Sequence, residues 1–400
     1  MKKYILVTGG ELRNKGAQAM SFITVDEMAK RYPDCEVVLF SGMDYKRPED
    51  EKSNYKFKIL PFPGFGESLS LMTGLLKGRY LKRENGKAFA EYKNIFENAV
   101  LLLDISGFAL GSKWPDHTNK GYIRRIRLAK HFKIPVYLMP QSFGPFDFKG
   151  KNSKKIAKFL NKTLPYPKLI MARENEGAEF LKQKFCLKNV IKTPDLVLQN
   201  RELELRNIYR EIPLGKEINI PERSVAIIPN WKNNVFGNEG KILELYSSII
   251  ELLVSKDYNV RLIYHALEDL KICNQIKDTC FSDCEKVEVI TEELSCIDFD
   301  EIVEEFDFII GSRFHSIVHA YKKAVPAVVL GWAVKYQELT RSLQQEQYCF
   351  SVEKDNLYGE ILNKISEMCD NFRAESEIIS AGIAEIQKEN VYDFIDIKLI

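Results

Sequence analysis

The sequence lacks a long hydrophobic run, a surplus of charge of one sign and a signal-like start. Its longest apolar stretches, such as Val325–Leu330, fall far short of the roughly 20 residues that a membrane-spanning helix needs. Lys and Arg number 58 and Asp and Glu 56, so the net charge of +2 excludes a global field that would attract nucleic acid. The first apolar stretch, in MKKYILVTGG, is too short for the core of a secretory signal. We therefore expect a cytoplasmic protein without a nucleic-acid partner.

Paired-cysteine motifs are also missing. The chain has eight cysteines, and no two have the Cys-x-x-Cys spacing of a zinc site or a redox motif. Four of them fall between Cys273 and Cys296, but no histidine stands at ligand spacing there. We expect reduced thiols and no bound metal.

Short apolar strands alternate with segments of helical period along most of the 400 residues. The runs YILVTG, EVVLFS, AVLLLDIS, IPVYLMP and KLIMAR are apolar throughout, as parallel strands covered by helices on both faces must be. The same pattern restarts after a polar stretch near 199–222. The sequence predicts an α/β protein with Rossmann-like domains at 1–200 and 201–352, and C-terminal helices at 353–400.

Polar residues follow several strands of the first predicted domain, where ligands bind in open α/β sheets. Asn14 and Lys15 open a helix after a Gly pair, so backbone N–H groups there could hold an anion or a sugar hydroxyl. Asp104 and Gln141 end the next two buried strands, and Arg173 ends a further one. An arginine at a strand end is either a salt-bridged structural residue or a ligand clamp, and we favour the clamp.

The densest pattern lies in the second predicted domain, in DFIIGSRFHSIVHAYKKAVPAVVLGWAVKY. A strand ends before Ser312, and the next helix carries Arg313 and His315 in its first turn. A first-turn arginine at a helix N-terminus favours an anion, and the adjacent histidine can transfer a proton. His319 lies one turn deeper and reads as a packing residue, whereas Lys335 follows the next strand and could reach the same cleft.

Several of these strings together resemble the polysaccharide pyruvyl transferase family. They are NKGAQAM, DISG, QSFGPF, ARE, PDLVL and the long string above, in the family's order from residue 9 to 336. The resemblance implies two domains facing one another across a cleft in a glycosyltransferase-B-like arrangement. It implies transfer of the pyruvyl group of phosphoenolpyruvate to a sugar diol as a ketal. Arg173, Arg313 and His315 match the family's donor-binding and catalytic positions, and Lys335 matches its downstream lysine.

The chemistry of this donor fits the residues at hand. Phosphoenolpyruvate carries a phosphate and a carboxylate, which planar arginine forks bind better than lysine does. We expect Arg173, Arg313, Lys335 and Ser312 to bind the donor as co-substrate, with no further cofactor. We expect His315 to transfer the proton, as general acid or as base toward a hydroxyl, and Arg313 to assist catalysis.

The acceptor is expected to be a sugar diol of a polysaccharide, a repeat unit or a lipid-linked oligosaccharide. We expect Asn14, Lys15, Asp104 and Gln141 to contact it. Two alternatives stay open: a glycosyltransferase of the same fold that uses a nucleotide sugar, and a glycan-binding protein without catalysis. Fold alone does not separate the two enzymes.

One local charge run stands out against the neutral total. Lys149–Lys168 contains seven lysines and no acidic residue, with apolar residues at helical spacing. Such a helix is either a solvated face of the protein or a contact for anionic lipid, which would place the protein peripherally at the inner membrane face.

Overall fold

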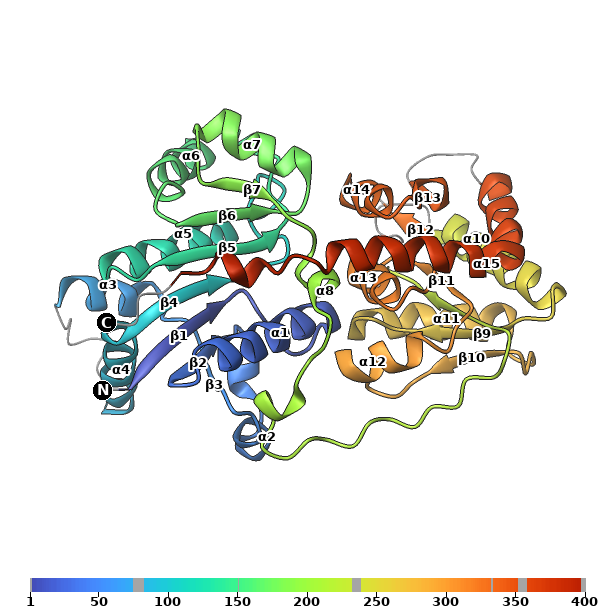
Figure 1. Ribbon diagram of the computed structural model, residues 1–400, viewed down its shortest axis with the longest axis horizontal. Coiled ribbons are helices and arrows are strands. Elements are labelled where there is room, and N and C mark those ends of the chain that lie inside the picture. Colours follow the sequence, from blue (N-terminus) through green and yellow to red (C-terminus); the bar gives the residue numbers. More distant parts are fainter. Residues whose placement is uncertain are drawn as a thin grey trace.

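The computed structural model describes residues 2–74, 83–149, 151–231, 239–331, 334–351 and 358–396. These residues form two all-parallel sheets, each with helices on both faces (Figure 1). The strand order is β3-β2-β1-β4-β5-β6-β7 in the first sheet and β10-β9-β8-β11-β12-β13 in the second. The predicted α/β fold with two Rossmann-like halves is confirmed.

The first half contains the elements up to α8. Its strands are β1 (Lys3–Thr8), β2 (Cys35–Phe40), β3 (Lys58–Leu60), β4 (Ala99–Asp104), β5 (Val136–Gln141), β6 (Leu169–Ala172) and β7 (Val190–Lys192). Its helices are α1 (Lys15–Arg31), α2 (Glu49–Asn54), α3 (Phe65–Thr73), α4 (Arg83–Glu97), α5 (Asp116–His131), α6 (Lys151–Thr163), α7 (Asn175–Phe185) and α8 (Leu196–Gln199), with the short turn η1 (Asp44–Lys46).

The second half follows a connection that includes the turn η2 (Leu205–Asn207). Its strands are β8 (Ser224–Ile228), β9 (Asn259–Ile263), β10 (Val287–Ile290), β11 (Phe308–Gly311), β12 (Ala327–Gly331) and β13 (Cys349–Ser351). Its helices are α10 (Glu239–Ser255), α11 (Leu270–Cys280), α12 (Cys296–Val303), α13 (Phe314–Lys322), α14 (Val334–Ser342) and α15 (Tyr358–Ile386), with the turns η3 (Leu267–Asp269), η4 (Glu346–Tyr348) and η5 (Val391–Phe394).

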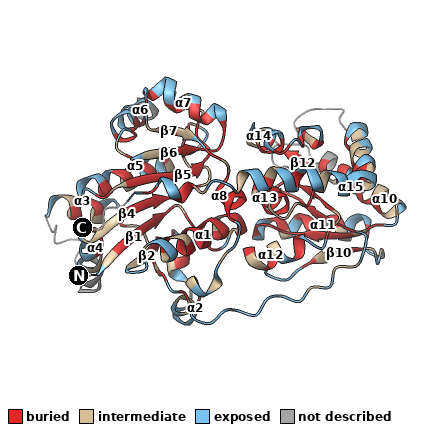
Figure 2. Cartoon of the chain, in the orientation of Figure 1, coloured by how far each residue is buried: buried red, intermediate tan, exposed pale blue. Residues whose placement is uncertain are grey.

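The central strands are buried on both faces, which explains why they read as continuous apolar runs (Figure 2). One apolar cluster continues from the first half into the second. It includes Phe22 on α1, Leu196 on α8, Phe299 on α12 and Ile317 on α13. The two halves therefore share a core along one side of their junction, and this shared core fixes the strand ends of both sheets opposite one another.

The C-terminal segment ties the two halves together. Where the sequence predicts C-terminal helices at 353–400, the structure has one long helix, α15, whose first part packs on the second half through Ile361 and Ile365. Its last part, with Ile379 and Ile383, packs into the shared core. Beyond it the chain crosses to the first half, where η5 lies against α1 (Figure 1).

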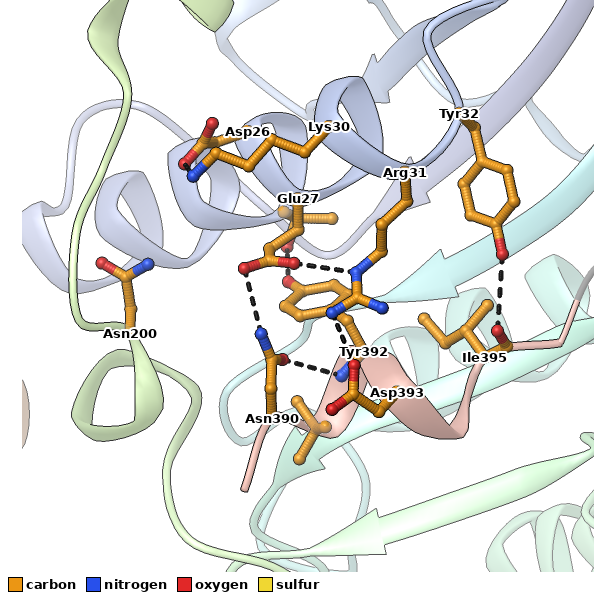
Figure 3. A network of polar contacts seen from close by, with 12 residues as sticks. Asp26, Glu27, Lys30, Arg31, Tyr32, Asn200, Asn390, Tyr392, Asp393 and Ile395 are labelled. Carbon is orange, nitrogen blue, oxygen red and sulfur yellow. Dashed lines mark hydrogen bonds and ion pairs between the residues drawn. The ribbon is translucent and has the colours of Figure 1, made fainter. Parts of the chain in front are cut away.

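Polar contacts hold this crossing segment on α1 (Figure 3). Tyr392 Oη lies 2.7 Å from Thr24 Oγ1. Arg31 donates to both Glu27 and Asp393, at 2.9 and 2.7 Å. Asn390 donates to the other oxygen of Glu27 at 3.1 Å. We call residues 387–396 the C-terminal strap.

Candidate functional site

Two neighbouring pockets lie where the carboxyl ends of the two sheets meet. The first, which we call the cationic pocket, has a volume of about 290 Å³. It is lined by Arg173, Glu174, Lys192, Thr193, Pro194, Asp195, Leu198, Phe314, Lys335, Glu338, Leu339, Ser342 and Ile386. Its lining comes from both halves, and it brings together two of the predicted donor-binding residues, Arg173 and Lys335. Three basic residues line it (Arg173, Lys192 and Lys335) together with three acidic ones (Glu174, Asp195 and Glu338), so its name refers to the basic residues alone.

The second pocket, which we call the N-terminal pocket, measures about 450 Å³. It is lined by Gly9, Gly10, Glu11, Asn14, Ala17, Met20, Phe40, Gly42, Ser106, Gly107, Phe108, Ala109, Trp114, Arg125 and His315. All but His315 belong to the first half. The glycine after β1 is required here, because Gly9 has φ +82° and a Cβ on it would lie 2.0 Å from Ser106 Oγ.

Arg173 is fixed at the end of β6 by a dense set of partners. Its guanidinium donates to Asp195 Oδ2 at 2.6 Å, and to the Gly107 carbonyl and Ser142 Oγ at 2.7 Å each. It also lies over the Phe314 ring, 4.7 Å from the centroid. Its Nε is buried and has no hydrogen-bond partner among the described residues. Arg173 is therefore an ion-paired residue that also lines a pocket, and its role as a ligand clamp stays a prediction.

His315 stands between the two pockets. It lines the N-terminal pocket, while its Nε2 lies 3.9 Å from the Asp195 carboxylate, which lines the cationic pocket. That Nε2 has no hydrogen-bond partner within the described part of the chain. The ring packs against Gly16 so closely that a Cβ there would lie 2.1 Å from its Cγ. The helix start of α1 thus leaves room for this imidazole.

Burial sets the protonation state of His315. Desolvation lowers its pKa to about 3, although the Asp195 carboxylate acts in the opposite direction. The imidazole is therefore neutral near pH 7, and its unpartnered nitrogen can accept a proton. A positive charge formed on the ring would be stabilised by Asp195, because that carboxylate stays ionised: burial acts to raise its pKa, but the charge of Arg173 and the hydrogen bonds from Arg173 and the Val197 N–H lower it.

Two of the predicted acceptor residues lie behind the N-terminal pocket instead of lining it. Asp104 is buried and accepts from Arg125 at 3.0 Å and from Thr8 Oγ1 at 2.7 Å. Gln141 is buried as well and donates to the carbonyl of Asp104 at 3.2 Å. Arg125 also donates to Ser106 Oγ at 2.9 Å, so Asp104 positions the side chains that face the pocket.

Asn14 and Lys15 separate, although they are neighbours in sequence. Asn14 lines the N-terminal pocket and caps α1 by accepting from the Ala17 N–H. The Lys15 side chain crosses to the second half, where its ammonium donates to the carbonyls of Tyr264 and His265 at 3.1 and 3.4 Å. Burial lowers the pKa of Lys15 to about 8. Its observed role is to join the two halves.

Arg313 and Ser312 are not among the described residues that line either pocket. Arg313 precedes α13, and its guanidinium forks onto both carboxylate oxygens of Asp269, at 2.7 and 2.6 Å, and onto Glu268 at 3.0 Å. Ser312 is buried beside Tyr246, with 2.9 Å between their hydroxyl oxygens. Donor binding by these two residues stays a prediction.

Lys335 lies where the two pockets approach each other. Its ammonium is 4.9 Å from the ring centroid of Phe314 and 5.9 Å from that of Phe108. Phe108 lines the N-terminal pocket and Phe314 the cationic one. Lys335 therefore adds positive charge close to both.

Two residues of this site were missed from the sequence. Asp195 lies in the string PDLVL, which carries part of the family resemblance, but it received no role; the structure makes it the shared partner of Arg173 and His315. Arg125 falls in the middle of a helix that has several basic residues, so its inward orientation had no distinct signal. Only the packing of α5 on the sheet shows that it faces the pocket.

Two further searches of the described residues gave no candidates. None of their helices combines the length and the apolar character needed to cross a membrane. No group of three or more His, Cys, Asp or Glu side chains among them is arranged to hold a metal ion.

Two buried histidines predict a loss of stability in mild acid. Desolvation lowers the pKa of His265 well below 6.5, as it does for His315, so the unfolded chain binds more protons than the folded one below pH 6.5. Above that pH the two histidines do not lower the free energy of unfolding. Below it, each histidine should lower the free energy of unfolding by up to about 1.4 kcal/mol per pH unit. Chemical denaturation of wild type and His315→Asn between pH 5 and 7.5 measures this. The variant should lose stability less steeply, and equal slopes would contradict the assignment.

The arrangement of the two sheets and their helices is shared with other solved structures. Solved structures with the same arrangement include a Rickettsia africae glycosyltransferase (TM-score 0.53, 13% identity, 98% of this chain and 95% of that one). S. aureus MnaA in complex with UDP gives TM-score 0.53 at 13% identity (94% and 91%). An S. aureus TarM mutant in complex with UDP, fondaparinux and alpha-GlcNAc-glycerol gives 0.54 at 12% (98% and 98%). The chain has the predicted glycosyltransferase-B-like fold.

The family follows from the sequence itself. The model of the polysaccharide pyruvyl transferase family matches residues 14–333, and the chain belongs to this family. It is thus a transferase of polysaccharide biosynthesis, as the ordered strings predicted. No curated protein sequence matches the chain.

Proposed function

We propose that this protein transfers the pyruvyl group of phosphoenolpyruvate to two hydroxyls of a sugar and forms a ketal. The observation that carries the proposal is the position of His315, an unpartnered neutral imidazole between a small cationic pocket and a larger pocket lined by hydrogen-bonding groups. The family assignment supports it.

The donor belongs in the cationic pocket. At about 290 Å³, this pocket is at the small end of ligand sites, which suits a compact dianion or trianion. Arg173 and Lys335 supply the positive charge. In this proposal Arg313 also binds the donor, for which its guanidinium leaves the carboxylates of Asp269 and Glu268.

The acceptor belongs in the N-terminal pocket. Asn14, Ser106 and Arg125 offer hydrogen bonds to sugar hydroxyls, while the rings of Phe108 and Trp114, 5.4 Å apart, offer an apolar face. Asp104 and Gln141 position this lining from behind, and Lys15 fixes the opposite half. A sugar of a polysaccharide, a repeat unit or a lipid-linked precursor fits this description.

In the proposed reaction, His315 transfers one proton from an acceptor hydroxyl to the methylene carbon of the donor. Neutral His315 accepts the proton of the first acceptor hydroxyl and passes it to the methylene carbon of the donor, which becomes a methyl group and leaves C2 electrophilic. The acceptor oxygen bonds to C2 as this proton arrives. The C2–O bond to phosphate then breaks, and the second hydroxyl bonds to C2. Its proton leaves with the phosphate. Asp195 stabilises the imidazolium that exists between the two transfers.

Incubation with phosphoenolpyruvate and candidate glycans tests the proposal. We expect acceptor-dependent release of phosphate together with a product mass increase that matches one pyruvyl ketal. Turnover of a nucleotide sugar, with none of phosphoenolpyruvate, would instead favour the glycosyltransferase alternative. The similar structures of MnaA and TarM, both solved with UDP, are the reason to test it. Binding of a glycan without turnover of either donor would favour a glycan-binding protein.

A second part of the proposal concerns where the acceptor is met. The basic segment includes α6, which carries the exposed lysines Lys154, Lys155 and Lys158. On the same helix, Ile156 and Leu160 are buried in the core of the first half. Two residues of the apolar edge predicted for this helix are thus used by the fold, whereas the third, Phe159, is 46% exposed. Membrane contact at the inner face would rest on charge, at about 1 kcal/mol for each lysine near an anionic surface.

We expect wild type to sediment with anionic vesicles at low salt and the variant Lys154→Glu/Lys155→Glu/Lys158→Glu to remain in solution. Neutral vesicles and a salt series give the charge dependence. The variant Lys216→Glu/Lys271→Glu/Lys388→Glu makes the same change of net charge at exposed lysines of other regions, and it should bind like wild type. Equal sedimentation of all three proteins, or of none, would identify α6 as a solvated face.

A further inference from the structure

A carboxylate of the protein itself closes one side of the cationic pocket. Glu338 lies on α14 in the second half, and it accepts from the backbone N–H groups of Asn175 and Glu176, at 2.8 and 3.4 Å, in the first turn of α7 in the first half. The Lys192 ammonium is 3.7 Å from the same carboxylate. The side chain of Glu338 is only 12% exposed.

This environment is built for an oxyanion. The N-terminus of an eleven-residue helix concentrates N–H donors and the positive end of its dipole. Lys192 and Lys335 line the same pocket and add two cations. Glu338 supplies the negative charge, and it stands three residues after Lys335 on one face of α14.

Two unsatisfied groups in the same pocket point to a ligand that is larger than one carboxylate. Thr193 Oγ1 belongs to a residue 5% exposed, and Arg173 Nε to one 7% exposed; neither atom has a hydrogen-bond partner among the described residues, although the Glu174 carboxylate lies 3.8 Å from Arg173 Nε. Both residues line the cationic pocket. Buried polar groups are normally paired, so donors left over in a pocket indicate a bound polar ligand.

We propose that the N-terminus of α7, with Lys192 and Thr193, is a phosphate subsite that the Glu338 carboxylate occupies until a ligand displaces it. A bound phosphate takes over the N–H groups of Asn175 and Glu176, and its remaining oxygens reach the donors that Glu338 leaves unused. The exchange replaces a contact between the two halves by a contact with the ligand. The inference rests on the proposed function only in taking the phosphate to be that of phosphoenolpyruvate.

Titration calorimetry with inorganic phosphate tests the subsite directly. Glu338→Gln removes the competing charge, so its affinity for phosphate should exceed that of wild type by about threefold or more. Lys192→Gln removes a cation of the subsite and should weaken phosphate binding by a similar factor. Glu346→Gln, at an exposed glutamate on the neighbouring η4, should bind phosphate like wild type.

The outcomes separate the subsite from the function. Equal or weaker phosphate binding by folded Glu338→Gln would make Glu338 a contact between the halves and nothing more. Where that variant does not fold, unchanged phosphate affinity in Lys192→Gln overturns the proposal. Tighter phosphate binding by Glu338→Gln without any turnover of phosphoenolpyruvate would reject the proposed function and leave the subsite. Turnover of phosphoenolpyruvate together with unchanged phosphate affinity in Glu338→Gln would reject the subsite and leave the proposed function.

Discussion

His315→Ala should lose about 10²–10⁴-fold of the turnover number, whereas the dissociation constant of the donor changes far less. The imidazole carries the proton from the acceptor hydroxyl to the donor in the proposed reaction, and its Nε2 is unpartnered among the described residues. The cationic contacts of the donor come from Arg173 and Lys335, which the variant keeps. Phosphate release under saturating substrates gives the first quantity, and calorimetric titration gives the second.

A second histidine serves as control for this prediction. His131→Ala, at the exposed end of α5, should leave both quantities unchanged. His315→Ala also removes a group that resists protonation, so it should be folded at neutral pH. A folded His315→Ala protein with near-normal turnover would remove His315 from the mechanism.

Asp195→Ala should lower the free energy of unfolding by about 3 kcal/mol, because it leaves Arg173 charged and buried with only the more distant Glu174 carboxylate, 3.8 Å from its Nε. The side chains of Asp195 and Arg173 are only 2% and 4% exposed, and their atoms are 2.6 Å apart. Asp195 also accepts from the Val197 N–H and so caps α8. Denaturant titration followed by circular dichroism measures the loss.

A double variant shows whether the missing partner is the cause. Asp195→Leu/Arg173→Met removes both charges, so it should recover much of the stability that Asp195→Ala loses. The exposed pair Lys93 and Glu97 provides the comparison, since Glu97→Ala should change stability little. A stability loss in Asp195→Ala no greater than in Glu97→Ala would contradict the burial argument.

The same pair should also affect catalysis. Asp195→Asn keeps the shape but removes the charge that faces the imidazolium of His315. Its effect on turnover should therefore exceed its effect on donor affinity, which is the split expected of a positioning residue.

The fold could be predicted from the sequence because parallel strands that are buried on both faces appear in it as continuous apolar runs. Runs such as AVLLL and VYLMP are apolar throughout, and they form β4 and β5, each of which ends on one polar residue. The positions of polar residues after strands predicted which edge of each sheet faces the site. His315, Arg173, Lys335 and Asn14 all line one of the two pockets as a result.

Side-chain direction was not readable in the same way. Lys15 and Asn14 are adjacent, yet one crosses to the second half and the other faces a pocket. Arg313 stands two residues before His315 but turns toward Asp269, a partner 44 positions away in the chain. Such directions depend on which carboxylate the tertiary fold brings near, and no local pattern records that.

The C-terminal strap has a consequence for the order in which the chain is made. Its residues cover α1, which is among the first elements to leave the ribosome, and they bury Tyr392 against it. Domains usually complete folding in the order of their synthesis. Here part of the α1 surface stays uncovered until the strap has been made and has left the ribosome, so a chain that ended before residue 387 would expose that surface.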